Sequence, residues 1–438
     1  MGCFLFGKSR RQPMETVHKV QVKFNQHLAK YKTHFNLPVF KFLRQMMYGI
    51  LLTKHVHLNK IGAVLGEEVT LKKTTERLSR NLQRKGLDKE LQKVHLQSNK
   101  YVIGQCKYLI FDHSDISKTY ALKMEGMEKV HDGSNDGIGY GYWLSNIIAT
   151  NSDGSTVIPV YSELYALNHA SENEQSENAK VIKAFETIEA QIDKPFIAVF
   201  DRGGDRKTLI NDHLAKGRYF IVRQTGARNL MYQNKLLPLK TLSRQVTLDH
   251  DITVTKTRNG KTRRITYQCG AIQVGFPKNN GQAWDVPLWL VVAKRDGRGY
   301  VWYLSYLPII SPEEAIKTTM EGYGNRWKIE EVHRHIKDDY HLEDIQLRNY
   351  SALKNFMVLF WLTMSMVYKD FEAISLEIIS SSGLKLTYKN KLSEYFGFIY
   401  YKIAKAISWA LSKVKLETKT PYARDPVKDN RQLCPELS

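Results

Sequence analysis

Three acidic residues, far apart in the chain, stand where a divalent-metal site would need them. Asp112 follows the apolar run 108–111 and Asp201 follows the apolar run 196–200, and such runs are typical of strands buried on both faces. An Asp at the end of such a strand lies at the edge of the sheet, where the sites of α/β folds form. Glu330 lies in a segment with helical spacing. Because carboxylate oxygens hold Mg²⁺ and Mn²⁺, we predict one metal site from these three residues. For either Asp alone, a turn or a helix cap is the alternative.

Glu330 shares its predicted helix with groups that bind phosphate. One face of a single helix would carry Tyr323, Arg326, Glu330 and Lys337. The arginine offers a bidentate fork to a phosphate, and the lysine offers a point charge. A solvated charged face is the alternative for an arbitrary helix. The two strand-terminal carboxylates favour a site that combines phosphate and metal.

These motifs, in this order, resemble those of the insertion-sequence-four family of cut-and-paste DDE transposases. The family's helical signature, Tyr-x2-Arg-x3-Glu-x6-Lys, matches residues 323–337 at every position. Residues 112–118 resemble its Asp-x-x-Asp-Ile-x-Lys pattern, and residues 201–206 resemble its Asp-Arg-Gly-x-Asp-Arg pattern. A strand at residues 218–223 is similar to the one that follows in the family. The likeness extends from about residue 101 to about residue 370.

The resemblance implies a chemistry and the roles of further residues. It implies that Asp112, Asp201 and Glu330 are catalytic and hold two Mg²⁺ ions, with Mn²⁺ as a substitute, for phosphoryl transfer. The side chains that would contact DNA phosphates are Tyr323, Arg326, Lys337, Arg202, Arg206 and Arg223. Trp302 stands where a tryptophan of the family stacks on an extruded base. A tryptophan in the core or on a strand surface is the alternative there.

The first hundred residues are strongly basic. They carry 20 Lys and Arg against 6 Asp and Glu, which is a net charge of 20 − 6 = +14. This is about two-thirds of the net charge of +21 of the whole chain. Such a region favours a polyanionic partner, and duplex DNA is the first candidate. Residues 58–65 and 70–82 resemble a helix-turn-helix. Its second helix carries the basic residues predicted to contact DNA, which are Lys72, Lys73, Arg77 and Arg80. The alternative is a small basic helical domain that does not contact base pairs in a DNA groove.

The chain divides into five predicted regions. They are a basic helical DNA-binding domain (1–100) that ends in a polar linker (97–100), the first part of the catalytic core (101–226), a β-strand insertion (227–307), the second part of the core with the Glu-bearing helix and C-terminal helices (308–415), and a tail expected to be disordered (416–438). The core's order of strand, strand, strand, helix, strand fits an α/β fold with an RNase H-like mixed sheet. Asn259-Gly260 predicts a hairpin between residues 249–258 and 261–267.

Other classes of site and location are disfavoured. The four cysteines form no Cys-x-x-Cys pair and the fourteen histidines show no metal-ligand pattern, so no zinc finger and no disulfide framework are predicted. The longest apolar stretch, 356–368, is shorter than the roughly 20 residues of a membrane-spanning helix. Residues 4–6 are too few for the apolar part of a signal peptide. We expect a cytoplasmic, nucleoid-associated protein with no nucleotide cofactor and no membrane partner.

The function expected from the resemblance is cut-and-paste DNA transposition. The protein would bind the terminal inverted repeats of an insertion sequence, cleave the DNA ends and join the 3′-hydroxyls to target DNA. Cutting both ends together requires at least a homodimer in the DNA complex. Two alternatives stay open: an RNase H-like metal-dependent DNA nuclease that joins no strands, and a catalytically silent, domesticated DNA-binding protein. The presence of all three carboxylates disfavours the silent protein.

Overall fold

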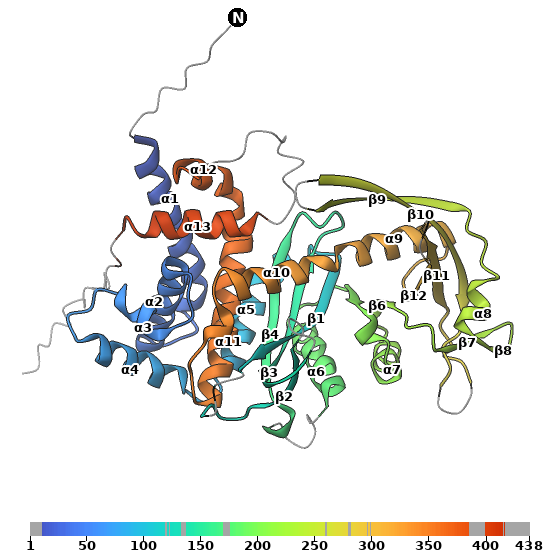
Figure 1. Cartoon of the computed structure of the whole chain (residues 1–438), viewed down its shortest axis with the longest axis horizontal. Coiled ribbons are helices and arrows are strands. Elements are labelled where there is room, and N and C mark those ends of the chain that lie inside the picture. The colour runs from blue at the N-terminus through green and yellow to red at the C-terminus, as the bar shows by residue number, and fades with distance from the viewer. Residues whose placement is uncertain are drawn as a thin grey trace, which may run out of the picture.

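A mixed sheet flanked by helices forms the middle of the molecule, a helical region lies at one end, and further strands lie at the other (Figure 1). The computed structural model describes residues 11–118, 121, 123–132, 137–169, 176–258, 261–278, 282–295, 297, 299–384, 399–414 and 416. Within these residues the main sheet has ten strands. The α/β class and the N-terminal helical region agree with the prediction.

The first half of the sheet combines antiparallel and parallel pairs. Its strands are β1 (Tyr108–Ser117), β2 (Glu128–Asp132), β3 (Gly137–Thr150), β4 (Val157–Tyr165), β5 (Ile197–Phe200) and β6 (Tyr219–Arg223). β3 pairs antiparallel with β1, β2 and β4, whereas β1, β5 and β6 are parallel. Parallel neighbours need a crossover, and α7 (Lys207–Ala215) supplies the one from β5 to β6. The helix α6 (Glu177–Glu189) connects β4 to β5.

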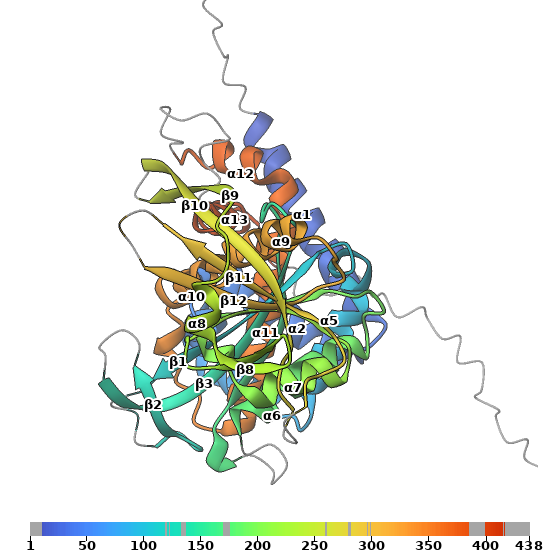
Figure 2. The same cartoon turned by 90° about the vertical axis from the view of Figure 1, so that its right-hand side faces the viewer.

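The helices lie on both faces of the sheet. Buried residues of α6 and α7 pack with one set of strand side chains, and those of α9 (Pro312–Asn325) and α10 (Trp327–Asp338) pack with the other set. Figure 2 shows the two helix pairs on opposite sides of the strands. The sheet is therefore covered on both sides, which explains why its central strands are apolar almost throughout.

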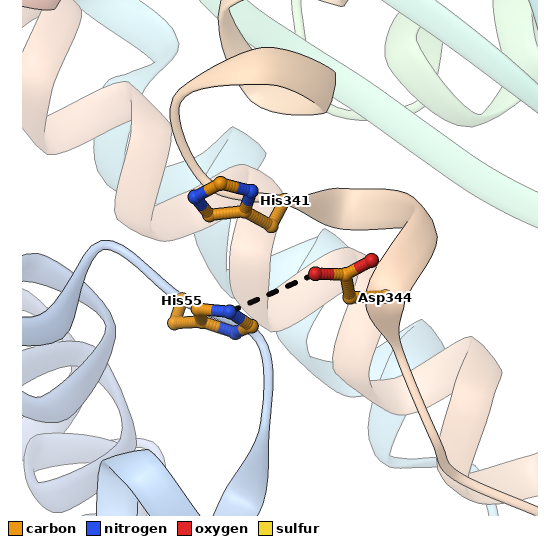
Figure 3. Close-up of side chains that lie close together, drawn as sticks. All are labelled: His55, His341 and Asp344. Atoms are coloured by element: carbon orange, nitrogen blue, oxygen red, sulfur yellow. Dashed lines mark ion pairs between the residues drawn. The ribbon is translucent and has the colours of Figure 1, made fainter.

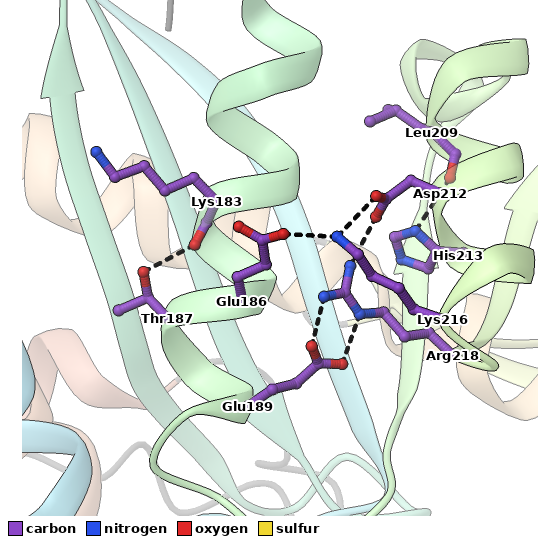
Figure 4. Close-up of polar contacts among 9 residues, drawn as sticks. All are labelled: Lys183, Glu186, Thr187, Glu189, Leu209, Asp212, His213, Lys216 and Arg218. Atoms are coloured by element: carbon purple, nitrogen blue, oxygen red, sulfur yellow. Dashed lines mark hydrogen bonds and ion pairs between the residues drawn. The ribbon is translucent and has the colours of Figure 1, made fainter. Parts of the chain in front are cut away.

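A polar network joins α6 and α7 to the start of β6 (Figure 4). The guanidinium of Arg218 is buried and donates to both carboxylate oxygens of Glu189 on α6 and to Oδ2 of Asp212 on α7 at 2.7 Å. Lys216 pairs with Glu186 at 2.6 Å and with Asp212 at 2.8 Å. Because both helices are attached to the same short loop, β6 is fixed beside β5.

The predicted β-strand insertion continues the main sheet. Its strands are β9 (His250–Arg258), β10 (Lys261–Val274), β11 (Leu288–Lys294) and β12 (Tyr300–Tyr306), and β12 pairs antiparallel with β6. The predicted hairpin is confirmed, since Arg258 pairs with Lys261 across the turn. Asn259 and Gly260 lie outside the described residues. A separate pair of strands, β7 (Asn229–Tyr232) and β8 (Lys235–Pro238), precedes the short helix α8 (Leu239–Ser243).

The N-terminal and C-terminal helices share one hydrophobic core. These helices are α1 (Arg11–Lys32), α2 (Leu37–Thr53), α3 (Leu58–Ala63), α4 (Leu71–Leu82), α5 (Leu87–Ile103), α11 (Tyr350–Ser365), α12 (Ser375–Ser381) and α13 (Tyr400–Leu411). A single buried cluster contains Phe24 of α1, Met46 of α2, Phe356 of α11 and Ile407 of α13. In Figure 1 the blue N-terminal helices accordingly lie beside the orange and red C-terminal ones. The described chain also has short turns of helix at η1 (Leu167–His169), η5 (Met366–Asp370) and η6 (Glu372–Ile374).

The predicted polar linker at residues 97–100 is wrong, because these residues lie inside α5. One of them, Asn99, is buried and makes a hydrogen bond within the protein. Its side-chain amide donates to the carbonyl of His95 at 2.9 Å. Leu96 and Ile103 on the same helix are buried as well. The helical region therefore passes into β1 without a flexible connection. No helix among the described residues is long and apolar enough to span a membrane.

Two glycines of α9 allow a matched test of this packing. A Cβ added to Gly322 would lie 2.6 Å from Cε1 of Tyr108 and 2.8 Å from Cδ1 of Ile221, whereas one added to Gly324 would meet no atom within 4 Å. We predict that Gly322→Ala lowers the free energy of unfolding by about 1–3 kcal/mol through overpacking. Gly324→Ala should be neutral or raise it by about 0.5–1 kcal/mol through helix propensity. Urea denaturation midpoints measure both, and equal shifts would contradict the packing of α9 against β1 and β6.

Candidate active site

Asp112 and Asp201 lie at the same end of a parallel strand pair. Ile110 of β1 is opposite Val199 of β5, and each Asp comes two residues later in its own strand direction. The prediction that Asp112 ends its strand is wrong, because β1 continues to Ser117 in antiparallel pairing with β3. Asp112 lies instead where its other neighbour, β5, stops. The two carboxylates therefore come from adjacent strands, at the point where β5 ends and β1 continues.

The start of α10 adds Glu330 to this pair through Arg326. Nη1 of Arg326 lies 3.8 Å from Oδ2 of Asp112, and Nη2 donates to Oε1 of Glu330. Asp112 is largely buried, with 18% of its side chain exposed, whereas 55% of the Glu330 side chain is exposed. Burial raises the pKa of Asp112 to about 7, Arg326 opposes this rise, and the charges of Asp201 and Glu330 add to it. The charges of Asp201 and Glu330 thus act on the carboxylate of Asp112.

Arg326 also interrupts the helix that the sequence predicts as continuous. α9 ends at Asn325 and α10 begins at Trp327, so the prediction of a single helix from Tyr323 to Lys337 is wrong. The amide of Arg326 donates to the carbonyl of Tyr323 at 3.1 Å, a bond of one tight turn. The side-chain amide of Asn325 donates to the carbonyls of Asn151 and Ser152, which holds the break against the loop after β3.

His333 is a neighbour of the site that the sequence reasoning did not include. Its Nδ1 lies 3.8 Å from Oδ2 of Asp112, and its Nε2 accepts from the side-chain amide of Asn146 at 3.1 Å. Asn146 is the residue opposite Asp112 across the β1–β3 pair. Burial, with a smaller effect of the Lys337 charge, lowers the pKa of His333 to about 3, so the ring is neutral. The signal in the sequence is the spacing of three residues after Glu330, which places both side chains on neighbouring turns.

The motif that follows β5 is mostly occupied with internal contacts. Oδ1 of Asp201 accepts from the amide of Gly203 at 2.7 Å and so caps the turn η3 (Arg202–Gly204). Asp205 is buried and pairs with Arg228 at 2.6 Å. Arg206 pairs with Glu177 of α6 at 2.6 Å, whereas Arg202 is exposed. The alternative of a cap is therefore observed for Asp201, and its participation in a metal site stays a prediction.

The comparison with known families fits this arrangement of carboxylates. Residues 109–366 match the family model of the transposase DDE domain. The chain belongs to this family. The match covers more than half of the 438 residues and contains Asp112, Asp201 and Glu330. No curated protein matches the sequence. The protein is therefore a DNA-acting transposase, an enzyme of transposition and recombination.

Divalent metals are the usual cofactors of DDE transposases, and the donor set of this transposase suits them. The charges of Asp201 and Glu330 raise the pKa of Asp112, and a cation placed among the three carboxylates would offset this effect. The guanidinium of Arg326 supplies positive charge at that place, between Asp112 and Glu330. Among the described residues, the oxygens of the three carboxylates do not all lie within 4.8 Å of one another.

The remaining predicted DNA contacts of the catalytic region lie in three different places. Nη1 of Arg223, at the end of β6, donates to the hydroxyl of Tyr323 at 3.4 Å, so these two lie together. Lys337 pairs with Asp115 at 3.1 Å and with Glu343 at 3.0 Å, away from Glu330. Trp302 lies on the opposite face of the sheet from Tyr323, because side chains alternate along β12.

The ring of Trp302 packs beside Gly226, where an added Cβ would lie 2.6 Å from Cζ3, and its indole nitrogen is buried without a hydrogen-bond partner. The structure thus favours the core alternative for this tryptophan.

The predicted basic residues of the second N-terminal helix differ in their surroundings. Lys72, Lys73 and Arg80 are exposed on α4. Arg77 instead donates to Oε1 of Glu67 at 2.7 Å, and Glu67 also accepts from Gln45 and Thr74. Arg77 therefore fastens α4 to the preceding turn and is less available to DNA than the other three.

This difference predicts two kinds of effect. Arg77→Ala should lower the free energy of unfolding by about 1 kcal/mol, because the Glu67 carboxylate loses its charged partner. The triple variant of Lys72, Lys73 and Arg80 to Ala should stay within about 0.5 kcal/mol of the parent. A plot of the logarithm of its DNA-binding constant against the logarithm of salt concentration should be less steep than that of the parent. The slope should change by about 0.9 for each phosphate contact removed. Urea denaturation and filter binding between about 50 and 200 mM salt measure these effects. A triple variant with the parental salt slope would remove α4 from the DNA interface.

Proposed function

We propose that this transposase is a cut-and-paste enzyme of the insertion-sequence-four family with an RNase H-like core. The observation that carries the proposal is the meeting of Asp112, Asp201 and Glu330, from two adjacent strands and one helix, around the buried Asp112. The strand order β4–β3–β1–β5–β6, with β3 antiparallel and β1, β5 and β6 parallel, supports the core. The Tyr-Arg-Glu-Lys signature supports the family.

Asp112, Asp201 and Glu330 would hold two Mg²⁺ ions, or Mn²⁺ in their place. When bound, such ions activate the attacking oxygen and neutralise the leaving 3′-oxygen of a phosphodiester. The chain's own contribution is the arrangement of the carboxylates. Asn146 and His333 flank Asp112 and limit the directions in which its carboxylate can turn.

Arg326 would have a different partner in the free protein and in the DNA complex. In the free protein its guanidinium offsets the repulsion between Asp112 and Glu330. On DNA the same fork would bind a phosphate beside the scissile bond. The hydroxyl of Tyr323 and the guanidinium of Arg223 lie together and would contact the same backbone. Lys337 would exchange its pairing with Asp115 and Glu343 for the phosphate of the element's end.

Recognition of the terminal inverted repeats would rest on the exposed basic face of α4. α3 and α4 pack against each other as the two helices of a helix-turn-helix do. Since cutting requires both ends, two copies of the chain would meet on DNA, each supplying one site. The protein would then be found with the nucleoid. Because α1, α2 and α5 share a core with α11 and α13, point variants of the full chain are better tests than an N-terminal deletion.

The carboxylate triad makes the first prediction of this proposal. Asp112→Asn, Asp201→Asn and Glu330→Gln should each lower cleavage and joining of DNA that carries the element's ends by more than about tenfold, since each removes a metal ligand. End binding in a gel-shift assay should persist. Asp338→Asn, an exposed carboxylate on the same helix, is the control and should act like the parent. Parental cleavage by any triad variant would remove that residue from the site, and cleavage without joining would indicate a nuclease.

A second prediction concerns the phosphate fork. Arg326→Ala should weaken the cleaved-end complex and slow joining by about ten- to a hundredfold, because a charge-assisted contact is worth about 1.5–3 kcal/mol. Arg326→Lys should restore only part of the activity, since a point charge does not reproduce a bidentate fork. Arg334→Ala, which removes an exposed arginine of α10, is the control. Full activity of Arg326→Ala at raised Mn²⁺ would mean that this arginine acts only on the metal site.

A further inference from the structure

A second group of metal-ligand side chains lies outside the carboxylate triad (Figure 3). His55 belongs to the segment between α2 and α3, and His341 and Asp344 belong to the segment between α10 and α11. One ligand atom of each lies within 4.8 Å of those of the other two. Nε2 of His55 is 3.7 Å from Oδ2 of Asp344, and the rings of His55 and His341 are stacked with 4.9 Å between their centres. The group therefore joins two parts of the chain that are almost three hundred residues apart.

The backbone around the group holds these side chains in place. Nε2 of His57 pairs with the main-chain carbonyl of Asp344 at 2.6 Å, which ties the two segments directly. His341 has a left-handed backbone, with φ 54° and ψ 48°, at the start of η4 (Leu342–Asp344). Residues other than glycine adopt this conformation rarely, and it persists where the surroundings impose it. His55 is buried, whereas His341 and Asp344 are exposed, so an ion could enter from solvent.

The donor set selects a class of ion. Two imidazoles and one carboxylate suit Zn²⁺ and other divalent transition metals, whereas Mg²⁺ prefers oxygen ligands alone. At Zn²⁺ bond lengths of about 2.0–2.1 Å, tetrahedral ligand atoms lie about 3.3–3.5 Å apart. The 3.7 Å between His55 and Asp344 is close to this, and the ligand atom of His341, which lies within 4.8 Å of the other two, needs a shift of at most about 1.5 Å. We propose that His55, His341 and Asp344 bind a Zn²⁺-class ion that clamps the helical region to the segment after the catalytic helix.

The hydrogen bonding of His55 shows which ring nitrogen faces the site. The amide of His57 donates to Nδ1 of His55 at 3.3 Å, so the ring proton is on Nε2 and faces Asp344. When a metal binds Nε2, that proton moves to Nδ1 and the ring stays neutral. This move of the proton breaks the long hydrogen bond that the amide of His57 donates to His55. That hydrogen bond is much weaker than the metal–imidazole bond that forms.

The position of the clamp gives it a consequence for the rest of the protein. The carbonyls of Glu343 and Ile345 accept from the buried ammonium of Lys118 at the end of β1. The carboxylate of Glu343 pairs with Lys337 on α10. An ion held by His341 and Asp344 would fix this segment, and with it the end of the helix that carries Glu330. We infer a stabilising role that is separate from the chemistry at the triad.

Zinc binding by the full, tag-free chain tests the proposal. Metal-free protein is titrated with Zn²⁺, bound zinc per chain is measured by atomic emission, and the unfolding temperature is measured with and without Zn²⁺. The parent should bind one more Zn²⁺ than His341→Asn or Asp344→Asn, with more than about a tenfold loss of affinity at this site in the variants. Asn tolerates the left-handed backbone of residue 341, and both side chains are exposed, so these variants should fold.

Two controls separate this site from others. His250→Ala removes a histidine that pairs with Asp249 at 2.6 Å and that belongs to no group of three metal-ligand side chains among the described residues, so this variant should bind zinc like the parent. Asp112→Asn should keep the site, even if it abolishes cleavage, so failure of the proposed function and failure of this site are distinguishable. Zn²⁺ should raise the unfolding temperature of the parent and of both controls. Equal zinc content and equal thermal shifts in the parent and His341→Asn would overturn the proposal and leave a His–Asp contact without an ion.

Discussion

The buried charge of Asp112 is the constraint on which the catalytic half of the protein depends. Its carboxylate lies between β3, the end of β5 and the start of α10, where burial and two neighbouring carboxylates all oppose ionisation. Arg326 offsets this unfavourable environment from the helix junction. A charge in such surroundings is tolerable only while its partners keep their places, because an unpaired buried charge is strongly destabilising. The end of β5, the continuation of β1 and the junction of α9 and α10 therefore all lie beside this one side chain.

The elements that hold the triad come from distant parts of the chain and are joined by one sheet. β12 pairs with β6, so the strands that precede α9 are continuous with those that carry the two Asp residues. After β12 the chain continues into α9 and α10, which pack on the sheet. Gly322 allows α9 to lie close to Tyr108 and Ile221. The helical region shares its core with the C-terminal helices. A DNA end held by α4 would therefore keep a fixed position relative to the catalytic strands.

Many of the basic residues have partners inside the protein. Arg77 binds Glu67, Arg206 binds Glu177, and Lys337 binds Asp115 and Glu343. Exposed cations such as Lys72, Lys73, Arg80 and Arg202 can meet DNA without losing an ion pair that the structure records. The net charge of +21 thus attracts a polyanion to the protein as a whole. How much a single basic side chain adds to the free energy of DNA binding depends on whether it must first leave an ion pair within the protein.

The sequence by itself determined most strands and helices of the core, the hairpin at β9–β10 and the membership of the DDE transposases, because apolar periodicity, turn residues and motif order are local properties. It also named Asp112, Asp201 and Glu330, and the structure places the last two close enough to Asp112 to act on its charge. Tertiary structure decided what depends on neighbours. It carried β1 past Asp112 by pairing with β3, and it broke the expected helix at Arg326, where Asn325 is anchored to the loop after β3. It turned Trp302 to the other face of the sheet from Tyr323 and placed His333 beside Asp112. It also brought His55 to His341 and Asp344, which no local pattern contains, since their proximity arises only when α2 and α11 pack in one core.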